Sequence, residues 1–335
     1  MTAEWLGRWA RLSFRLQRWE VLASVAGVGV LAVAMLWFAW QLRGLAAAEP
    51  GCPDPHAYVP GCETLAQRFQ GLADWGTGLL FLSWGAPFGV GLLLGVPIVT
   101  REVEGRTAGI SWTLSLSQAQ WLLARIAFAA VVVVVLLAVV VLASGVLAAA
   151  IQPQLHLDRD FTWYGHRDGL IVARGLAALG LGALVGAVVG RILPALLAAA
   201  FASVLVFGAL SLGMDRWNET LAIVIDPSAM PNGAREWEGA MGMGGAIELP
   251  SGELVSYADV AVDIQYGDAS GGLYTRYDEA ANEPDPSSFV GWERSFVVAG
   301  KRYPEVLARE AGVAAGLGLL ATGAAVAVVR RRRPG

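Results

Sequence analysis

Six apolar segments of membrane length dominate this sequence and restrict what it can fold into. A helix needs about twenty residues to cross a bilayer. The segments are Val21–Trp40, Gly76–Thr100, Ile126–Ala150, Leu170–Gly190, Ile192–Met214 and Ala311–Val329. Arg174 is the only charged residue within them. The sequence therefore predicts an all-α membrane protein with six transmembrane helices, five within residues 21–214 and the sixth, with a basic tail, within residues 311–335.

The composition agrees with this fold class and argues against others. Apolar residues make up 56% of the 335 residues and charged residues only 16%, whereas charged residues are about a quarter of an ordinary soluble domain. A single soluble globule of this size has too little interior to hold so many apolar side chains. A soluble enzyme, a disordered regulator and a nucleic-acid-binding protein are therefore poor interpretations.

The arginines are divided unevenly between the two sides of the membrane. Six spans place both termini on one side, and that side carries twelve arginines against five in the short segments on the other. Basic residues prefer cytoplasmic loops. The distribution predicts a multi-pass protein of the plasma membrane with both termini in the cytoplasm.

The N-terminal residues 1–20 carry two stripes at helical spacing. The apolar stripe contains Trp5, Trp9, Leu12, Leu16 and Trp19. The basic stripe contains Arg8, Arg11, Arg15 and Arg18. Such a helix lies in the plane of the membrane surface. We expect a cytoplasmic interfacial helix that either braces the bundle or simply anchors the first span.

Residues 215–310 separate the last two spans and are expected to lie outside the cell. From 215 to 305 they hold 16 acidic and 6 basic residues, and long loops cross the membrane whatever their charge. Ala246–Leu249 and Leu254–Tyr257 read as strands around a Pro-Ser-Gly turn, and Val260–Tyr266 alternates as an edge strand does. We expect a small mixed α/β extracytoplasmic subdomain.

Both cysteines, Cys52 and Cys62, fall in the first outer loop. An oxidising location and a short Pro-rich loop favour a disulfide over two free thiols. Closing so small a loop would contribute about 2–3 kcal/mol in the chain-entropy model.

The sharpest motif, residues 101–121, lies between the second and third spans on the predicted cytoplasmic side. It opens with the charged run Arg101-Glu102-Val103-Glu104-Gly105-Arg106-Thr107 and continues through Trp112 and several hydroxyl residues to Trp121. A short polar helix held between two membrane helices can transmit force from a soluble partner to the spans. We therefore expect this segment to be a coupling helix.

This stretch closely resembles the permease subunits of ABC exporters from high-GC bacteria. The matching residues are Pro97, Arg101, Glu102, Glu104, Thr107, Trp112, Thr113, Ser115, Trp121 and Leu122. Arg106 stands where the family usually has glycine, and Gln118 where it usually has arginine. The likeness extends over all six spans and is weak over the outer subdomain. It implies that an ATPase docks on the coupling residues Arg101, Glu102, Glu104, Arg106, Thr107, Ile110 and Trp112.

The resemblance also implies a complex of two permeases, expected to be a homodimer, with two cytoplasmic ATPase subunits. The chain has no Gly-x-x-x-x-Gly-Lys-Ser/Thr loop of its own, so ATP and Mg are expected on the partner ATPase. We expect this chain to have no catalytic residue, no cofactor and no nucleic-acid partner. Spans so poor in charge favour a hydrophobic or amphipathic cargo, such as a lipid, an antibiotic or a peptide, and make membrane lipid a further partner.

Two features of the fourth span have a structural and a functional interpretation. Gly182, Gly186 and Gly190 form a small-residue ladder, which suits either packing within one chain or an interface between two permeases. Arg174 either extends outward to the membrane surface or lines a cavity that selects cargo. The outer residues His156, Asp158, Asp160, His166 and Asp168 fit no standard metal site, so no metal is predicted.

Two other functions stay open. The permease-like body could transmit ATPase motion to an envelope partner without moving cargo. The chain could also be a membrane-embedded hydrolase, although the hydroxyls of the coupling segment, Ser111, Ser115 and Ser117, have no histidine near them in the sequence. An exporter should have an open apolar cavity at its dimer interface. A mechanical transmitter should have closely packed spans and a partner-binding face on the outer subdomain.

Overall fold

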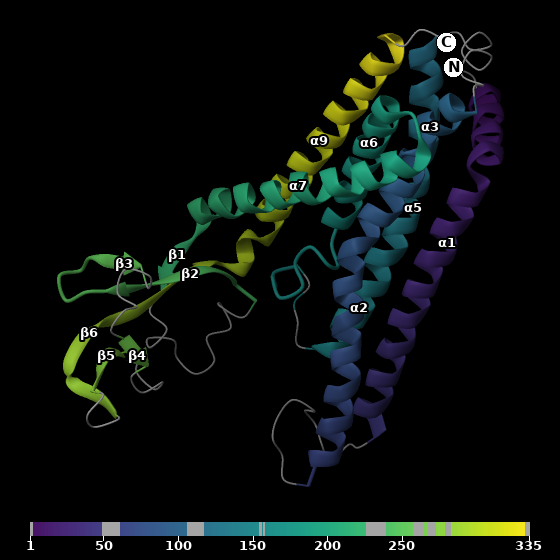
Figure 1. Cartoon of the computed structure of the whole chain (residues 1–335). Coiled ribbons are helices and arrows are strands. Elements are labelled where there is room, and N and C mark those ends of the chain that lie inside the picture. The colour runs from purple at the N-terminus through teal and green to yellow at the C-terminus, as the bar shows by residue number, and fades with distance from the viewer. Residues whose placement is uncertain are drawn as a thin grey trace. The chain divides into compact units, whose positions relative to one another are not determined.

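The computed structural model describes residues 3–48, 61–105, 117–153, 156, 158–225, 239–256, 264–266, 273–278 and 283–331. Six helices are long and apolar enough to cross a membrane, which confirms the predicted fold class. The long helices are α1 (Ala3–Ala48), α2 (Glu63–Gly95), α5 (Gln118–Ile151), α6 (Leu170–Val189), α7 (Ile192–Asn218) and α9 (Tyr303–Arg331), and the short helix α3 (Pro97–Glu104) follows α2 (Figure 1).

The chain divides into two compact units. The helical unit contains Met1–Leu155, Trp163–Ala209 and Leu307–Gly335, and the sheet unit contains His156–Thr162 and Leu210–Val306. The sheet unit therefore takes in most of the predicted outer subdomain, together with a short piece of the loop between α5 and α6.

The N-terminal helix runs into the first span without a loop. Within α1 only Gln17 has a non-helical backbone, with φ −116° and ψ 18°. The predicted interfacial segment is therefore helical but joined to the first span through a kink at Gln17. Its placement in the membrane plane stays a prediction.

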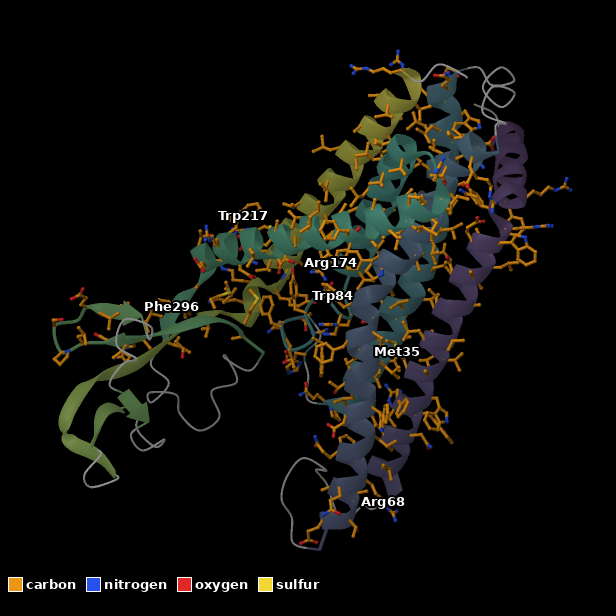
Figure 2. The ribbon with its side chains drawn as sticks, viewed as in Figure 1. Met35, Arg68, Trp84, Arg174, Trp217 and Phe296 are labelled. Carbon is orange, nitrogen blue, oxygen red and sulfur yellow. The ribbon has the colours of Figure 1, made fainter. Side chains whose placement is uncertain are left out.

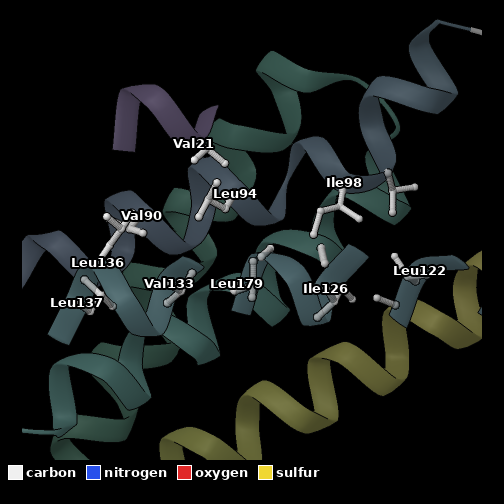
Figure 3. Packing of buried hydrophobic residues seen from close by; sticks show 14 of the residues in the cluster. Val21, Val90, Leu94, Ile98, Leu122, Ile126, Val133, Leu136, Leu137 and Leu179 are labelled. Carbon is white, nitrogen blue, oxygen red and sulfur yellow. The ribbon is translucent and has the colours of Figure 1, made fainter. Parts of the chain in front are cut away.

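The helical unit is held by two apolar clusters along its length. In one, Val21 of α1 and Leu94 of α2 pack with Leu122 and Ile126 of α5 and with Leu179 of α6 (Figure 3). The buried residues of the other cluster come from α1, α2 and α5, which run side by side in Figure 1. They include Met35 (labelled in Figure 2), Leu42, Phe69, Leu80 and Leu147. These apolar faces hold together helices that are distant in the sequence.

Helix α6 is enclosed more completely than any other span. Its small residues allow this, because helix backbones can approach closely where side chains are absent. A Cβ on Gly180 would lie 2.5 Å from the carbonyl oxygen of Gly318 in α9, and one on Gly95 of α2 would lie 2.5 Å from that of Leu179. Glycine is therefore required on both sides of α6.

Two local signals shape the connection from α2 to α5. Pro97 lacks an N–H and separates α3 from α2, although Val96 between them keeps helical backbone angles. Ser117 is the N-cap of α5, and its Oγ accepts a hydrogen bond from the Gln120 N–H at 3.2 Å. The sequence Ser-Gln-Ala-Gln has the residue pattern of a capping box, and its N-cap hydrogen bond marks the start of the third span.

The sheet unit is built on an antiparallel six-stranded sheet. The strands are β1 (Ile223–Ile225), β2 (Met241–Glu248), β3 (Leu254–Ser256), β4 (Ile264–Tyr266), β5 (Leu273–Asp278) and β6 (Glu283–Val298), in the order β3-β2-β6-β5-β4 with β1 paired to β6. The predicted turn joins β2 to β3, with Gly252 at φ +83°. The residues of the predicted edge strand that are described, 264–266, form β4 at one end of that order.

The piece of the α5–α6 loop in the sheet unit is tied to it through its backbone. The Phe161 N–H donates to the carbonyl of Gly239 at 2.7 Å, and the Phe161 ring packs against Tyr303 with 5.1 Å between centroids. Asp160 accepts from the Thr162 N–H at 2.7 Å. Asp160 thus stabilises the local turn.

Candidate functional site

Three charged residues of α3 each contact a different helix of the same chain. Arg101 pairs with Glu20 of α1, Glu102 pairs with Arg125 of α5, and Glu104 accepts from the backbone at the start of α7. Because successive residues on a helix are rotated by about 100°, positions 101, 102 and 104 point in different directions. Helix α3 is therefore a junction at which one short element is linked to three spans.

The Arg125–Glu102 pair is the innermost contact of this junction. Arg125 Nη1 lies 3.0 Å from Glu102 Oε1 and also donates to the carbonyl of Ile98 at 3.1 Å. The guanidinium lies over the ring of Trp121, 4.9 Å from its centroid. A charge removed from water needs such a paired and hydrogen-bonded environment. Arg125 thereby joins α3 to α5, the two helices on either side of segment 106–116.

The other two contacts lie nearer the surface. Arg101 Nη2 is 2.6 Å from Glu20 Oε1, and the Arg101 side chain is 39% exposed. Glu104 Oε2 accepts from the N–H of Ile192 at 3.1 Å. Ile192 is the first residue of α7, and a carboxylate at a helix N-terminus is favourable because it satisfies a free N–H and faces the positive end of the helix dipole.

The structure bears on part of the predicted coupling site. Glu102, one of the residues on which the resemblance implies that an ATPase docks, is buried against Arg125, and its coupling role stays a prediction. Trp121 lies in the first turn of α5, so the predicted coupling helix does not extend to it. The remaining predicted coupling residues, Arg106, Thr107, Ile110 and Trp112, lie outside the described residues.

The residues that complete the junction were not singled out from the sequence. Arg125 had a signal, because it stands between the buried residues Leu122 and Ile126 on an otherwise uncharged helix. Glu20 also had one, since it is the first acidic residue after a run of arginines and immediately precedes the first span. An isolated charge at the end of an apolar helix suggests a partner, but the sequence alone did not indicate which one.

A second polar cluster joins α6 to α9 in the helical unit. Arg174 Nη2 lies 3.8 Å from Glu310 Oε2, and both side chains are mostly buried. Tyr164 lies beside the same carboxylate, and burial together with the charges of Glu310 and Asp168 raises the pKa of its phenol, so it stays protonated. Arg174, predicted either to extend to the surface or to line a cavity, lies between Glu310 of α9 and the carbonyl of Gly165, to which its Nη1 donates at 3.4 Å.

The loop before α6 is held to α2 by His166. Its Nδ1 lies 3.0 Å from the carbonyl of Leu80, and because a carbonyl only accepts, Nδ1 carries the hydrogen. Ser83 Oγ donates to the carbonyl of His166 at 2.8 Å. Asp168 accepts from the N–H groups of Gly165 and Leu170. Burial lowers the pKa of the His166 imidazole, and the Arg174 charge adds to this effect.

The glycine ladder of α6 faces its own chain. A Cβ on Gly186 would lie 2.6 Å from the carbonyl oxygen of Val96, and one on Gly182 would lie 3.2 Å from the Val96 nitrogen. Gly190 ends the helix in the left-handed conformation at φ 73°, which favours glycine. Gly182 and Gly186 therefore pack against the α2–α3 connection of the same chain, and an interface between two permeases at this ladder stays a prediction.

Two further predictions concern cysteine and metal. Cys62 is not a free thiol, while Cys52 lies outside the described residues, so the Cys52–Cys62 pairing stays a prediction. Among the described residues, no group of three or more His, Cys, Asp or Glu is placed to hold a metal ion.

Comparison with protein families places the chain in a class of membrane transporters. Residues 25–215 match the family model described as "ABC-2 membrane transporter related". The matched region covers more than half of the chain. It includes α3, Arg125 of α5, Arg174 of α6 and most of the first five spans. The chain therefore belongs to the ABC-2 membrane transporter related family. No curated protein and no solved structure matched the chain.

Proposed function

We propose that this chain is the permease subunit of an ATP-driven exporter and that α3 with segment 106–116 receives the motion of a separate ATPase. The family supports a transporter permease and ABC ATPase partners. The observation that carries the coupling role is the junction, in which α3 is linked to α1, α5 and α7 at once. A displacement of α3 would act on three spans together.

The proposed complex contains two ATPase subunits, which bind ATP and Mg, and two copies of this permease. Both termini, α3 and segment 106–116 lie in the cytoplasm, consistent with the bias of twelve arginines to five. The cargo is hydrophobic or amphipathic, because the described spans contain few charges and those at Arg125 and Arg174 are paired internally.

A mechanical transmitter that regulates an envelope partner is the second candidate. The observation that favours it is the close packing of α6. Glycines bring the backbone of α6 into contact with the backbone of α2 on one side and of α9 on the other. Reconstitution of the complex in liposomes separates the two candidates. ATP-dependent loss of a fluorescent lipid or amphipathic dye from the membrane would support export, and turnover without any such movement would support transmission.

The coupling role is tested with the double variant Trp112→Ala/Glu104→Lys. It removes an aromatic side chain of the kind that often dominates interface energy and reverses the charge that holds α7. We expect an inserted, folded permease that no longer copurifies with its ATPase or stimulates ATP turnover.

A matched control makes the same chemical changes at the opposite end of the bundle. Trp75 is exposed and Glu63 opens α2, so Trp75→Ala/Glu63→Lys should insert, fold and retain the ATPase. Unchanged copurification and turnover in a folded Trp112→Ala/Glu104→Lys variant would refute the coupling role.

A further inference from the structure

Several buried polar atoms of Arg125 and of the α1 segment 17–24 have no hydrogen-bond partner among the described residues. They are Nε and Nη2 of Arg125, Oε2 of Glu20, Oγ of Ser24 and both amide atoms of Gln17. Glu20 and Ser24 are four positions apart, so they share one face of α1, and Gln17 lies at the kink just before them. Val21 lies on the same face and packs with Leu122 and Ile126 of α5. This polar face of α1 is therefore directed toward the helix that carries Arg125.

Glu20 and Arg125 each use only part of their bonding capacity. Glu20 pairs with Arg101 through Oε1 and leaves Oε2 unused. Arg125 uses Nη1 for Glu102 and Ile98 and leaves Nε and Nη2 unused. Those two nitrogens form one edge of the planar guanidinium, which can hold a carboxylate through two parallel hydrogen bonds. Glu20 is close enough to act electrostatically on the Arg125 charge.

We propose that the junction exchanges ion pairs between two arrangements. In the arrangement described above, Arg101 holds Glu20 while Arg125 holds Glu102. In the second arrangement Arg101 leaves Glu20 for an acidic group of the docked ATPase, and Glu20 turns to the unused edge of Arg125. Arg125 keeps Glu102 on Nη1 throughout.

The energetics favour an exchange over a simple loss of contact. Arg101 is the accessible member of the junction, with 39% of its side chain exposed, whereas Glu20 is only 14% exposed. A carboxylate so placed is costly to leave unpaired, so removal of Arg101 drives Glu20 toward the nearest available donors. Helix α1, tied to α3 in the first arrangement, is then tied directly to α5.

The exchange predicts a conditional interaction between Glu20 and Arg125. Glu20→Gln removes the carboxylate charge. Arg125→Lys keeps a positive charge for Glu102 but lacks the guanidinium edge, formed by Nε and Nη2, that would bind Glu20. The test compares these two substitutions, singly and together, in wild-type permease and in an Arg101→Gln background. The readout is the midpoint of unfolding of the purified full-length permease in an SDS titration, without ATPase.

In wild-type permease the two midpoint shifts should depart from additivity only slightly, because Glu20 and Arg125 have different ion-pair partners and act on each other only through charge. In the Arg101→Gln background they should fail to add, because Glu20 now pairs with Arg125. Arg101→Lys, which keeps a cation for Glu20, should restore additivity. If the Arg101→Gln variant does not fold, the same measurements are made in an Arg101→Met background. Additive shifts in every background would overturn the exchange.

Only the departure of Arg101 to an ATPase rests on the proposed function. Additivity measured on the permease alone overturns the exchange and leaves the coupling role untouched. Non-additivity in the Arg101→Gln background supports the exchange. If the Trp112→Ala/Glu104→Lys variant also captures the ATPase normally, the exchange stands and the coupling role is overturned.

Discussion

Arg125 and Glu102 form an ion pair at 3.0 Å in which the side chains are only 1% and 8% exposed. The two residues are separated by 23 positions, and segment 106–116 lies between them. The pair therefore fixes the spacing of the two helices from which that segment emerges. Its burial also makes it sensitive to the loss of either partner.

Removal of one member of this pair should destabilise the permease strongly. Arg125→Met leaves the Glu102 carboxylate buried without its cation, and loss of one partner of a buried pair costs about 3–5 kcal/mol. Glu102→Leu/Arg125→Met removes both charges and should recover most of that loss. SDS-titration unfolding measures both. A double variant as unstable as Arg125→Met would contradict this account.

Substitution of Gly95 by alanine should destabilise the contact between α2 and α6. The new Cβ would lie 2.5 Å from the Leu179 carbonyl oxygen, and such overpacking costs about 1–3 kcal/mol. Gly89→Ala on the same helix is the control, because a Cβ there meets nothing within 4 Å. Alanine also has the higher helix propensity, so Gly89→Ala should be neutral or stabilising. Equal melting temperatures for the two variants would rule out the packing explanation.

The permease should lose stability on acidification through His166. Burial lowers the pKa of this side chain from 6.5, so the folded state favours neutral imidazole and the unfolded state binds its proton at higher pH. The stability contributed by His166 is therefore present above pH 6.5 and is lost as the pH falls through the folded-state pKa. Melting temperatures between about pH 7.5 and about pH 5 measure this loss.

The variant His166→Asn isolates that contribution. Its amide nitrogen can replace Nδ1 as the donor to Leu80 but does not titrate. We expect a flatter pH dependence than in wild-type permease. An unchanged slope would mean that another group carries the acid sensitivity.

Labelling of introduced cysteines on intact cells should report the orientation. Cysteine at position 232 or 270, between the last two spans, should react with an impermeant maleimide, and cysteine at position 110 should react only after the membrane is permeabilised. The reason is the arginine bias, which places both termini and position 110 in the cytoplasm. Reaction of position 110 from outside would reverse the topology and refute the transporter arrangement proposed above.

The first outer loop should contain a disulfide. Mass spectrometry of an alkylated, unreduced sample should find Cys52 and Cys62 linked and unmodified, because both lie on the predicted oxidising side. Cys52→Ser is the control and should leave one alkylated thiol at Cys62. Two alkylated thiols in the wild-type protein would disprove the pairing.

Local patterns were sufficient to predict much of the fold. The turn after β2 and the edge strand ending at Tyr266 follow from turn residues and alternating side chains, which act within a few positions of one another. The start of α5 was also encoded locally, in the capping box that begins at Ser117, but the charged and hydroxyl-rich segment before it was taken to continue to Trp121. That boundary was missed because a helix N-cap and a polar helix use the same residue types.

By itself the sequence determined the six spans, the sheet-forming segments and membership of a transporter family, because apolar length, residue alternation and motif matches are properties of the chain taken in order. Only the tertiary structure decided that Glu102 faces Arg125, that Gly182 and Gly186 pack against Val96, and that Arg174 pairs with Glu310. A buried charge or a glycine can be satisfied by many partners of the right chemistry. Which one it meets depends on how helices far apart in the chain come together.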